Sequence, residues 1–238
     1  MFKKLSKSLN TYGLSNLKYV VLMLILFTFY SCKEMIKPEK GGIDLISNVY
    51  VDASKGLDKV QNFHISRMNY SGSNILELIP DLNFPELTEN IFYIKDSIYY
   101  KIGTENSSNT IFSEISKKQQ PLLIKNKIEG AIFSKDWIPN YKNKKNLSDT
   151  ILFNKTYKRF EVNSPWTYSR FYIYPTDTIL PYSLYKHAEE DYGGRLERID
   201  SYNKKKDVFV TLQLITRKNW DNEAKEIFDF NAFVKKKK

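Results

Sequence analysis

The sequence contains few of the residues that most often build metal centres and catalytic triads. Its 238 residues include one cysteine, Cys32, and two histidines, His64 and His187, which lie far apart along the chain. A metal site needs a cluster of Cys, His, Asp or Glu side chains, and a serine or cysteine nucleophile needs a histidine in a recognisable context. The sequence therefore predicts no metal, no cofactor and no identifiable nucleophile.

Glycine and proline are also scarce, with 9 and 8 residues. These numbers exclude a collagen-like chain and a linker-dominated chain. The chain has instead 42% hydrophobic residues, including 17 tyrosines and 15 phenylalanines. Aromatic residues favour strands over helices, and a chain of this length buries a sizeable core. A β-rich globular protein is therefore expected.

The formal net charge of +10 is concentrated at the two ends of the chain. The first 31 residues hold four lysines and no acidic residue, and the chain closes on Lys235–Lys238. Between Cys32 and Val234 there are 29 basic and 27 acidic residues, a net charge of about +2. This body lacks the clustered basic and aromatic residues of nucleic-acid modules, so no nucleic-acid partner is expected.

A short apolar run follows the N-terminal lysines. Tyr19–Tyr30 contains twelve residues without a charge, whereas a helix that spans a bilayer needs about 20. Lys33 and Glu34 end the run, and Ser31 supplies the small residue that a cleavage site requires. The positive start, the short apolar run and the small residue together predict a secretory signal peptide.

The pair Ser31-Cys32 resembles the cleavage site of bacterial lipoproteins, with Phe29 and Tyr30 in place of the usual leucine and small residue. In that family the cysteine thiol is acylated and the cysteine becomes the new N-terminus. The resemblance implies lipid attachment at Cys32 and contact with the membrane through that N-terminal anchor. The charged residues that follow are similar to signals that send lipoproteins to the outer membrane or cell surface. The expected location is the cell envelope, on the periplasmic or the outer side.

Two other interpretations of this segment stay open: an uncleaved membrane anchor with Cys32 incidental, and a cytosolic protein. We favour acylation because an exposed free thiol is a liability in an oxidising compartment. Two or more acyl chains also hold a protein stably on a membrane.

Three segments are expected: a signal peptide at 1–31, a flexible tether at 32–42 and a single β-rich domain at 43–238. The tether prediction rests on the polar run KEMIKPEKGG,. Within the domain, successive short apolar runs with polar turns favour an antiparallel sheet, because a parallel sheet needs crossover helices. The predicted fold class is mainly β, an antiparallel meander curled into a half-barrel or barrel with one or two short helices.

The predicted elements follow from the period of apolar residues and from turn residues. The pattern at 43–68 allows a strand at 49–51 or a short helix with Leu57, Val60 and Phe63 on one face. A short helix is expected to begin at Asp221 or Asn222 and to end at Phe228. The expected strands are 75–79, 91–94, 98–102, 128–133, 147–153, 157–162, 170–174, 179–184, 195–202 and 207–216.

The segment RFYIYPTDTILPYSLY at 170–185 is similar in layout to lipoprotein carriers, which are half-barrels with a hydrophobic groove. In that family a strand of the form Thr-x-Leu-Pro follows a hairpin turn, and Thr178-Ile-Leu-Pro181 occupies that place here. The resemblance implies a sheet wrapped around an apolar ligand.

The densest acidic cluster, Glu189, Glu190 and Asp191, lies beside His187. These residues could bind a divalent cation or perform acid–base chemistry, but a solvated charged loop between two strands is the favoured interpretation. The three tryptophans, Trp137, Trp166 and Trp220, are expected mainly in the core, with Trp166 the best candidate for an exposed ligand contact.

Three functions stay open at this point. The favoured one is a non-enzymatic envelope lipoprotein whose β-domain binds a partner protein or an apolar ligand. The alternatives are a hydrolase that acts on envelope glycan or peptide, and an immunity or assembly factor. An apolar groove lined by strand residues would favour the first, a polar cleft the second, and the absence of both the third.

Replacing the predicted acylated residue tests the location. Cys32→Ser is expected to abolish labelling with radioactive palmitate and to release the protein into the soluble fraction, because no other thiol is present. Unchanged membrane retention of the unlabelled variant would instead support the uncleaved anchor.

Overall fold

The structure is a computed structural model that describes residues 35–58, 60–103, 107–133 and 136–237. The description concerns the compact unit Ile36–Lys238 and the preceding Met35. Cys32 and the predicted signal peptide lie outside the described residues. In the described ranges, no helix has the length and apolarity needed to cross a bilayer.

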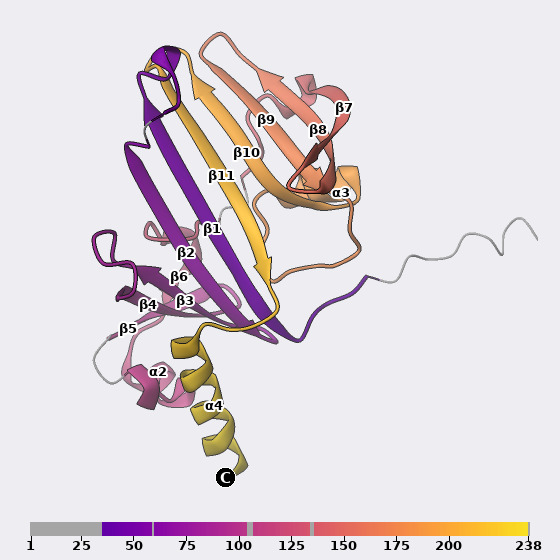
Figure 1. The fold of residues 1–238 in the computed structure, drawn as a ribbon. Helices are drawn as coiled ribbons and strands as arrows, with labels where there is room; N and C mark the ends of the chain where they lie inside the picture. The colour runs from indigo at the N-terminus through magenta and orange to yellow at the C-terminus, as the bar shows by residue number, and fades with distance from the viewer. Residues whose placement is uncertain (1–34, 59, 104–106, 134–135, 238) are drawn as a thin grey trace, which may run out of the picture. The chain divides into compact units, whose positions relative to one another are not determined.

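The described residues form one antiparallel sheet of eleven strands, which confirms the predicted fold class (Figure 1). The sheet is open, with β6 and β7 as its edges, in the order β6-β5-β4-β3-β2-β1-β11-β10-β9-β8-β7. The strands are β1 (Lys40–Val51), β2 (Asn62–Ser71), β3 (Asn74–Pro80), β4 (Thr88–Lys95), β5 (Ile98–Ile102), β6 (Leu122–Leu123), β7 (Lys145–Leu152), β8 (Lys155–Asn163), β9 (Thr167–Tyr174), β10 (Arg195–Asn203) and β11 (Val208–Arg217).

The sheet consists of two meanders joined through the first and last strands. β1 to β6 run outward on one side, and β11 back to β7 on the other. β1 pairs with β11 over ten residue pairs, from Gly42↔Arg217 to Val51↔Val208. The turns that end β1, β8 and β10 lie together at one end of the domain (Figure 1). The centre of the sheet therefore combines the two ends of the domain sequence.

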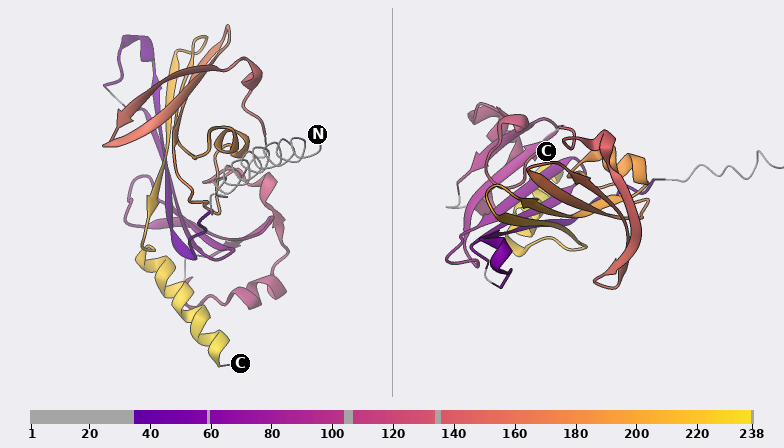
Figure 2. Two further views of the ribbon diagram at one scale, coloured as in Figure 1. Left: turned by 90° about the vertical axis from the view of Figure 1, so that its right-hand side faces the viewer. Right: turned by 90° about the horizontal axis from the view of Figure 1, so that it is seen from above.

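Three helices accompany the sheet within the described ranges: α2 (Phe112–Lys118), α3 (Lys186–Tyr192) and α4 (Asn222–Lys236). Both figures of the whole chain place α2 and α4 at the same end, beside β3–β5 (Figures 1 and 2). The helix predicted to end at Phe228 begins as expected but continues to Lys236, so the first two of the four C-terminal lysines are helical. The alternative helix at 57–63 is wrong, because Phe63 belongs to β2.

Two predicted strands are also wrong. Residues 128–133 and 179–184 are irregular, and the hairpin partner of β9 is β10 rather than 179–184. In both segments the apolar residues pack onto a face of the sheet instead of pairing along its edge. Burial against a sheet face leaves the same apolar signal in the sequence as strand formation. The Thr178–Pro181 motif therefore lies in an irregular segment and not in a strand.

The polar run before the domain is partly ordered. The Ile36 amide donates to Asp177 O and the Ile179 amide donates to Ile36 O, at 3.0 and 2.9 Å. β1 already begins at Lys40, so strand pairing starts before the predicted end of the tether. A Cβ at Gly41 would lie 2.6 Å from the Tyr70 hydroxyl, and one at Gly42 would lie 2.6 Å from the Arg217 guanidinium. The two glycines permit close packing rather than flexibility.

The sheet buries apolar residues on both faces. We call the face that carries Leu45, Leu214 and Phe160 the inner face. The residue pairs between β1, β11, β10, β9 and β8 place these three side chains on the same side of the sheet. One inner cluster centres on Leu45 and Leu214, and another packs Phe160 under α3. A third cluster lies on the outer face of β3–β5, beneath α2 and α4. Alternation in β8 places Phe160 and Val162 together on the inner face, where both are buried.

Phe160 provides a test of the inner core. Its ring is fully buried and stacks on Phe171 and Tyr192. Phe160→Ala is expected to lower the free energy of unfolding by about 3–5 kcal/mol because it leaves a cavity. Phe153→Ala, at an exposed turn, should change it by less than about 0.5 kcal/mol. Urea denaturation that gives equal losses for both variants would contradict the packing of β8.

Candidate functional site

A groove of about 650 Å³ lies on the inner face of the sheet, over β1, β2 and β11. The irregular segment 128–132 forms one wall, and the end of β3 with the loop that follows forms another. Most of its lining is apolar. The residues that line it are Leu45, Ser47, His64, Ile65, Ser66, Ile79, Pro80, Leu82, Glu89, Asn90, Ile128, Glu129, Gly130, Ala131, Ile132, Tyr182 and Leu212.

Strand register explains the floor of the groove. Ser47 of β1 faces His64 of β2 on one side and Leu212 of β11 on the other. Because side chains alternate along a strand, Leu45 and Ser47 share the inner face. Ser47 fills less space on this face than a larger side chain would, and a hollow therefore forms between Leu45 and Leu212.

A buried ion pair fixes the wall that contains residues 128–132. Lys127 Nζ lies 2.6 Å from Glu77 Oε2, and the two side chains are 1% and 0% exposed. Lys127 also donates to the carbonyl oxygens of Glu129 and Ala131. Glu77 accepts from the Ser66 hydroxyl at 2.6 Å and from the Ala131 amide. Burial of a charge is costly unless it is paired and hydrogen-bonded, and this network satisfies both charges.

The same network explains why residues 128–133 do not form a strand. Gly130 has φ +67, and a Cβ at this position would collide with the Glu77 carboxylate. The backbone therefore curls around the carboxylate, with its amide and carbonyl groups directed at Glu77 and Lys127 instead of a neighbouring strand. The apolar residues on either side of Gly130 are left at the groove.

Tyr182 connects the other irregular segment to this wall. Its hydroxyl donates to Ile132 O at 3.1 Å, and its ring meets Phe133 edge-on at 4.9 Å. Burial raises the pKa of Tyr182 well above its usual value, so the hydroxyl stays protonated and keeps donating. The segment 179–184, predicted as a strand, instead helps to close the groove.

The mouth of the groove carries exposed apolar side chains. Leu82, Ile128 and Ile132 are each half or more exposed. The loop after β3 has a fixed shape, because the Asp81 carboxylate accepts from the Asn83 and Phe84 amides at 2.7 and 3.0 Å. Apolar surface that a fixed loop holds in solvent marks interaction sites.

The predicted acidic cluster does not converge on a cleft. His187 stacks on Trp137 at 4.3 Å, and burial lowers the pKa of His187. Glu189 accepts from the Ser183 hydroxyl and the Leu196 amide, and burial raises its pKa. Asp191 accepts from Lys144 and the Tyr141 hydroxyl, which lower its pKa.

Glu190 pairs with Lys186 at the surface, at 3.5 Å. Each acidic side chain of the cluster therefore has partners of its own. Among the described residues, no group of three or more His, Cys, Asp or Glu side chains lies close enough to hold a metal ion. The cluster lies on the helix α3, where a loop was expected.

The tryptophans lie outside the groove lining. Trp166 is exposed as expected, and Trp137 is equally exposed although a core position was expected. Trp220 packs on Phe228 at 4.7 Å and donates to Tyr70 O at 2.8 Å. Of the three tryptophans, Trp220 is therefore the one that packs against the core, as expected.

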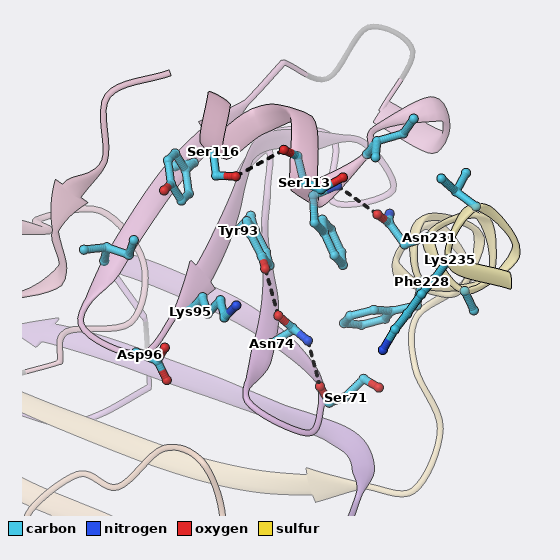
Figure 3. A pocket seen from close by; sticks show the side chains of 16 residues that line it. Ser71, Asn74, Tyr93, Lys95, Asp96, Ser113, Ser116, Phe228, Asn231 and Lys235 are labelled. Carbon is cyan, nitrogen blue, oxygen red and sulfur yellow. Dashed lines mark hydrogen bonds between the residues drawn. The ribbon is translucent and has the colours of Figure 1, made fainter. Parts of the chain in front are cut away.

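A second cavity, of about 790 Å³, lies between α2, α4 and the turns after β2 and β4 (Figure 3). Its aromatic side chains are engaged with each other: Tyr93 stacks on Phe112 at 4.2 Å, and Phe112 meets Phe228 edge-on. The Tyr93 hydroxyl donates to Asn74 at 2.8 Å, and Asn231 accepts from the Phe112 amide. Since these groups already have partners, the inner groove is the stronger candidate.

Comparison with known proteins gives no family. No family model matches the chain, and no curated protein matches it significantly. An uncharacterised conserved protein from Thermus thermophilus is 9% identical, over 76% of this chain and 82% of its own, with a TM-score of 0.34. A domain described as an outer membrane lipoprotein-sorting protein, from Vibrio parahaemolyticus, is 12% identical, over 83% of this chain and 92% of its own, with a TM-score of 0.28. PNGF-II is 9% identical, over 77% of this chain and 30% of its own, with a TM-score of 0.33. These scores are too low to establish a shared fold or function.

Removing one partner of the buried ion pair tests how the groove wall is held. Lys127→Met is expected to lower the free energy of unfolding by about 3–5 kcal/mol, because it leaves the Glu77 carboxylate buried without its cation. The double variant Glu77→Gln with Lys127→Met should regain much of that loss. Lys125→Met, an exposed lysine near the same wall, is the control. The pairing would be contradicted if urea denaturation showed that the double variant loses as much free energy of unfolding as the single variants Lys127→Met and Glu77→Gln lose together.

Proposed function

We propose that this chain is a lipid-anchored envelope protein whose β-domain binds the apolar part of a ligand without catalysis. The observation that carries the proposal is the inner groove, which is lined mainly by apolar residues and bordered by exposed apolar side chains. Its volume of about 650 Å³ lies within the range of about 300–1,000 Å³ that ligand pockets occupy.

The groove supports a ligand that has a flexible apolar chain. Its floor and walls present Leu45, Leu212 and Ile79, while the polar side chains gather at Ser47, His64 and the mouth. Burial of apolar surface contributes roughly 25 cal/mol per Å², which favours a hydrocarbon chain over a polar substrate. The distribution of polar groups favours a ligand with one polar end.

The two alternative functions gain less support. A hydrolase that used the cluster near His187 would need its acidic groups to converge, whereas Glu189 and Asp191 are bonded to different partners. An immunity or assembly factor was expected to lack an internal groove. The loop after β3 exposes Phe84 and Leu87, which would suit contact with a partner protein. We propose that this partner delivers the ligand to the groove or receives it.

The lipid anchor would hold the domain near the membrane. Ile36 is the first residue of the compact unit, and four residues of extended chain span at most about 14 Å. A lipid on Cys32 would therefore keep the domain close to a bilayer, where apolar ligands are found. The outer membrane is the proposed location, on the basis of Lys33 and Glu34 after the cysteine.

Filling the groove tests the proposal. In a soluble form that begins at Lys33, Ser47→Trp is expected to weaken binding of dodecyl maltoside at least about tenfold, because the indole occupies the floor. Asn48→Trp, the next residue on the opposite face of β1, should bind like the unmodified domain. Isothermal titration calorimetry below the critical micelle concentration measures both. Absence of binding by the unmodified domain, or equal binding by Ser47→Trp, would refute the groove as the binding site.

A further inference from the structure

The charges at the groove have one sign. Among the described residues that line it, the carboxylates of Glu89 and Glu129 are the charged groups, and no lysine or arginine is present. Both glutamates are exposed, and neither belongs to β1, β2 or β11, which form the floor, so we place them at the mouth. The remaining titratable groups of the lining are His64, which is exposed, and Tyr182, which is buried.

The lysines nearby do not reverse this sign. Lys127 is buried and its ammonium is committed to Glu77 and two carbonyl groups, so it cannot receive an anionic ligand group. Lys101 lies 3.9 Å from Glu129, with both side chains half or more exposed. The Lys101 ammonium offsets part of the Glu129 charge but does not exceed it. Glu89 adds a second negative charge to the same mouth.

We propose that the groove selects a single-chain amphiphile with a cationic end group, such as an alkylammonium, over one with an anionic end group. The inference rests on the proposed function and names its ligand class. The alkyl chain lies along Leu45, Leu212 and Ile79, and the cation lies at the mouth near Glu89 and Glu129. Charge complementarity between the mouth and the end group provides the selectivity.

The volume of the groove favours an alkyl chain over a helical peptide. A helix of two turns is about 11 Å long and about 10 Å across, so even its cylinder exceeds the 650 Å³ of the groove. An alkyl chain is much thinner and passes between the wall at 128–132 and the floor. A basic amphipathic helix is therefore not the expected occupant.

The local charges outweigh the general charge of the protein. The body of the chain is slightly basic, with a net charge of about +2 between Cys32 and Val234. Exposed charges farther away than about 8 Å are largely screened at physiological ionic strength. A ligand end group at the mouth therefore responds mainly to Glu89 and to Glu129, whose charge Lys101 partly offsets.

Three probes with the same twelve-carbon chain test the inference on the soluble form that begins at Lys33, which retains the three core clusters found among the described residues. They are dodecyltrimethylammonium, dodecyl maltoside and dodecyl sulfate, each below its critical micelle concentration. The expected order of affinity is cation, neutral, anion, with the cation about five- to tenfold tighter than the neutral probe. Raising the salt to about 0.5 M should shrink this ratio.

The variant E89Q/E129Q is expected to lose the preference for the cation and to keep its affinity for dodecyl maltoside. The control E39Q/E226Q removes two exposed carboxylates that do not line the groove, and it should keep the preference. Circular dichroism checks that both variants are folded.

The outcomes separate the two proposals. Binding of dodecyl maltoside without a cation preference, or a preference that E89Q/E129Q leaves unchanged, would overturn the charge selectivity and leave the groove as a binding site. Binding of no probe would overturn the proposed function itself. Tighter binding of a basic amphipathic peptide than of any probe, still blocked by Ser47→Trp, would overturn the assignment to an alkyl chain.

Discussion

The pairing of β1 with β11 is the contact on which the rest of the domain depends. A polar network stabilises the end of this strand pair that contains Arg217. The Arg217 guanidinium lies 2.8 Å from Asp44 and 2.9 Å from Asp221. The fully buried Asn69 accepts from the Asp221 amide and donates to the Asp221 carboxylate, at 2.8 Å each. Asp221 precedes the first residue of α4, so one network fixes two strands and the start of the last helix.

The groove exists because of this pairing. Its floor combines Ser47 of β1 with Leu212 of β11 and His64 of β2, so residues from both ends of the domain sequence must meet before the hollow forms. Contacts of such separation form only after considerable chain entropy has been lost. Local hairpins cannot create the site by themselves.

Sequence reasoning succeeded where the signal is local and failed where it is not. The turns at Lys95–Ser97 and Asn203–Lys206 combine polar residues with flanking apolar strands, and both hairpins are present. The glycines at 41 and 42 suggested a flexible tether because the side chains that need the space, Tyr70 and Arg217, are distant in sequence. The groove residues could not be identified for the same reason, since Ser47, His64 and Glu89 look like ordinary strand residues and their proximity depends on register.

The segment that follows η3 (Ile124–Asn126) separates stability from recognition within three residues. Lys127 points inward, where Glu77 and backbone carbonyls neutralise it, and it holds the wall of the groove. Glu129 lies at the exposed mouth, where it pairs with the exposed Lys101, and little folding energy depends on such a pair,. Gly130 makes this possible, because its φ of +67 turns the backbone around the buried carboxylate. A charge that must be paired to be buried therefore supports a segment whose other charge stays exposed at the groove.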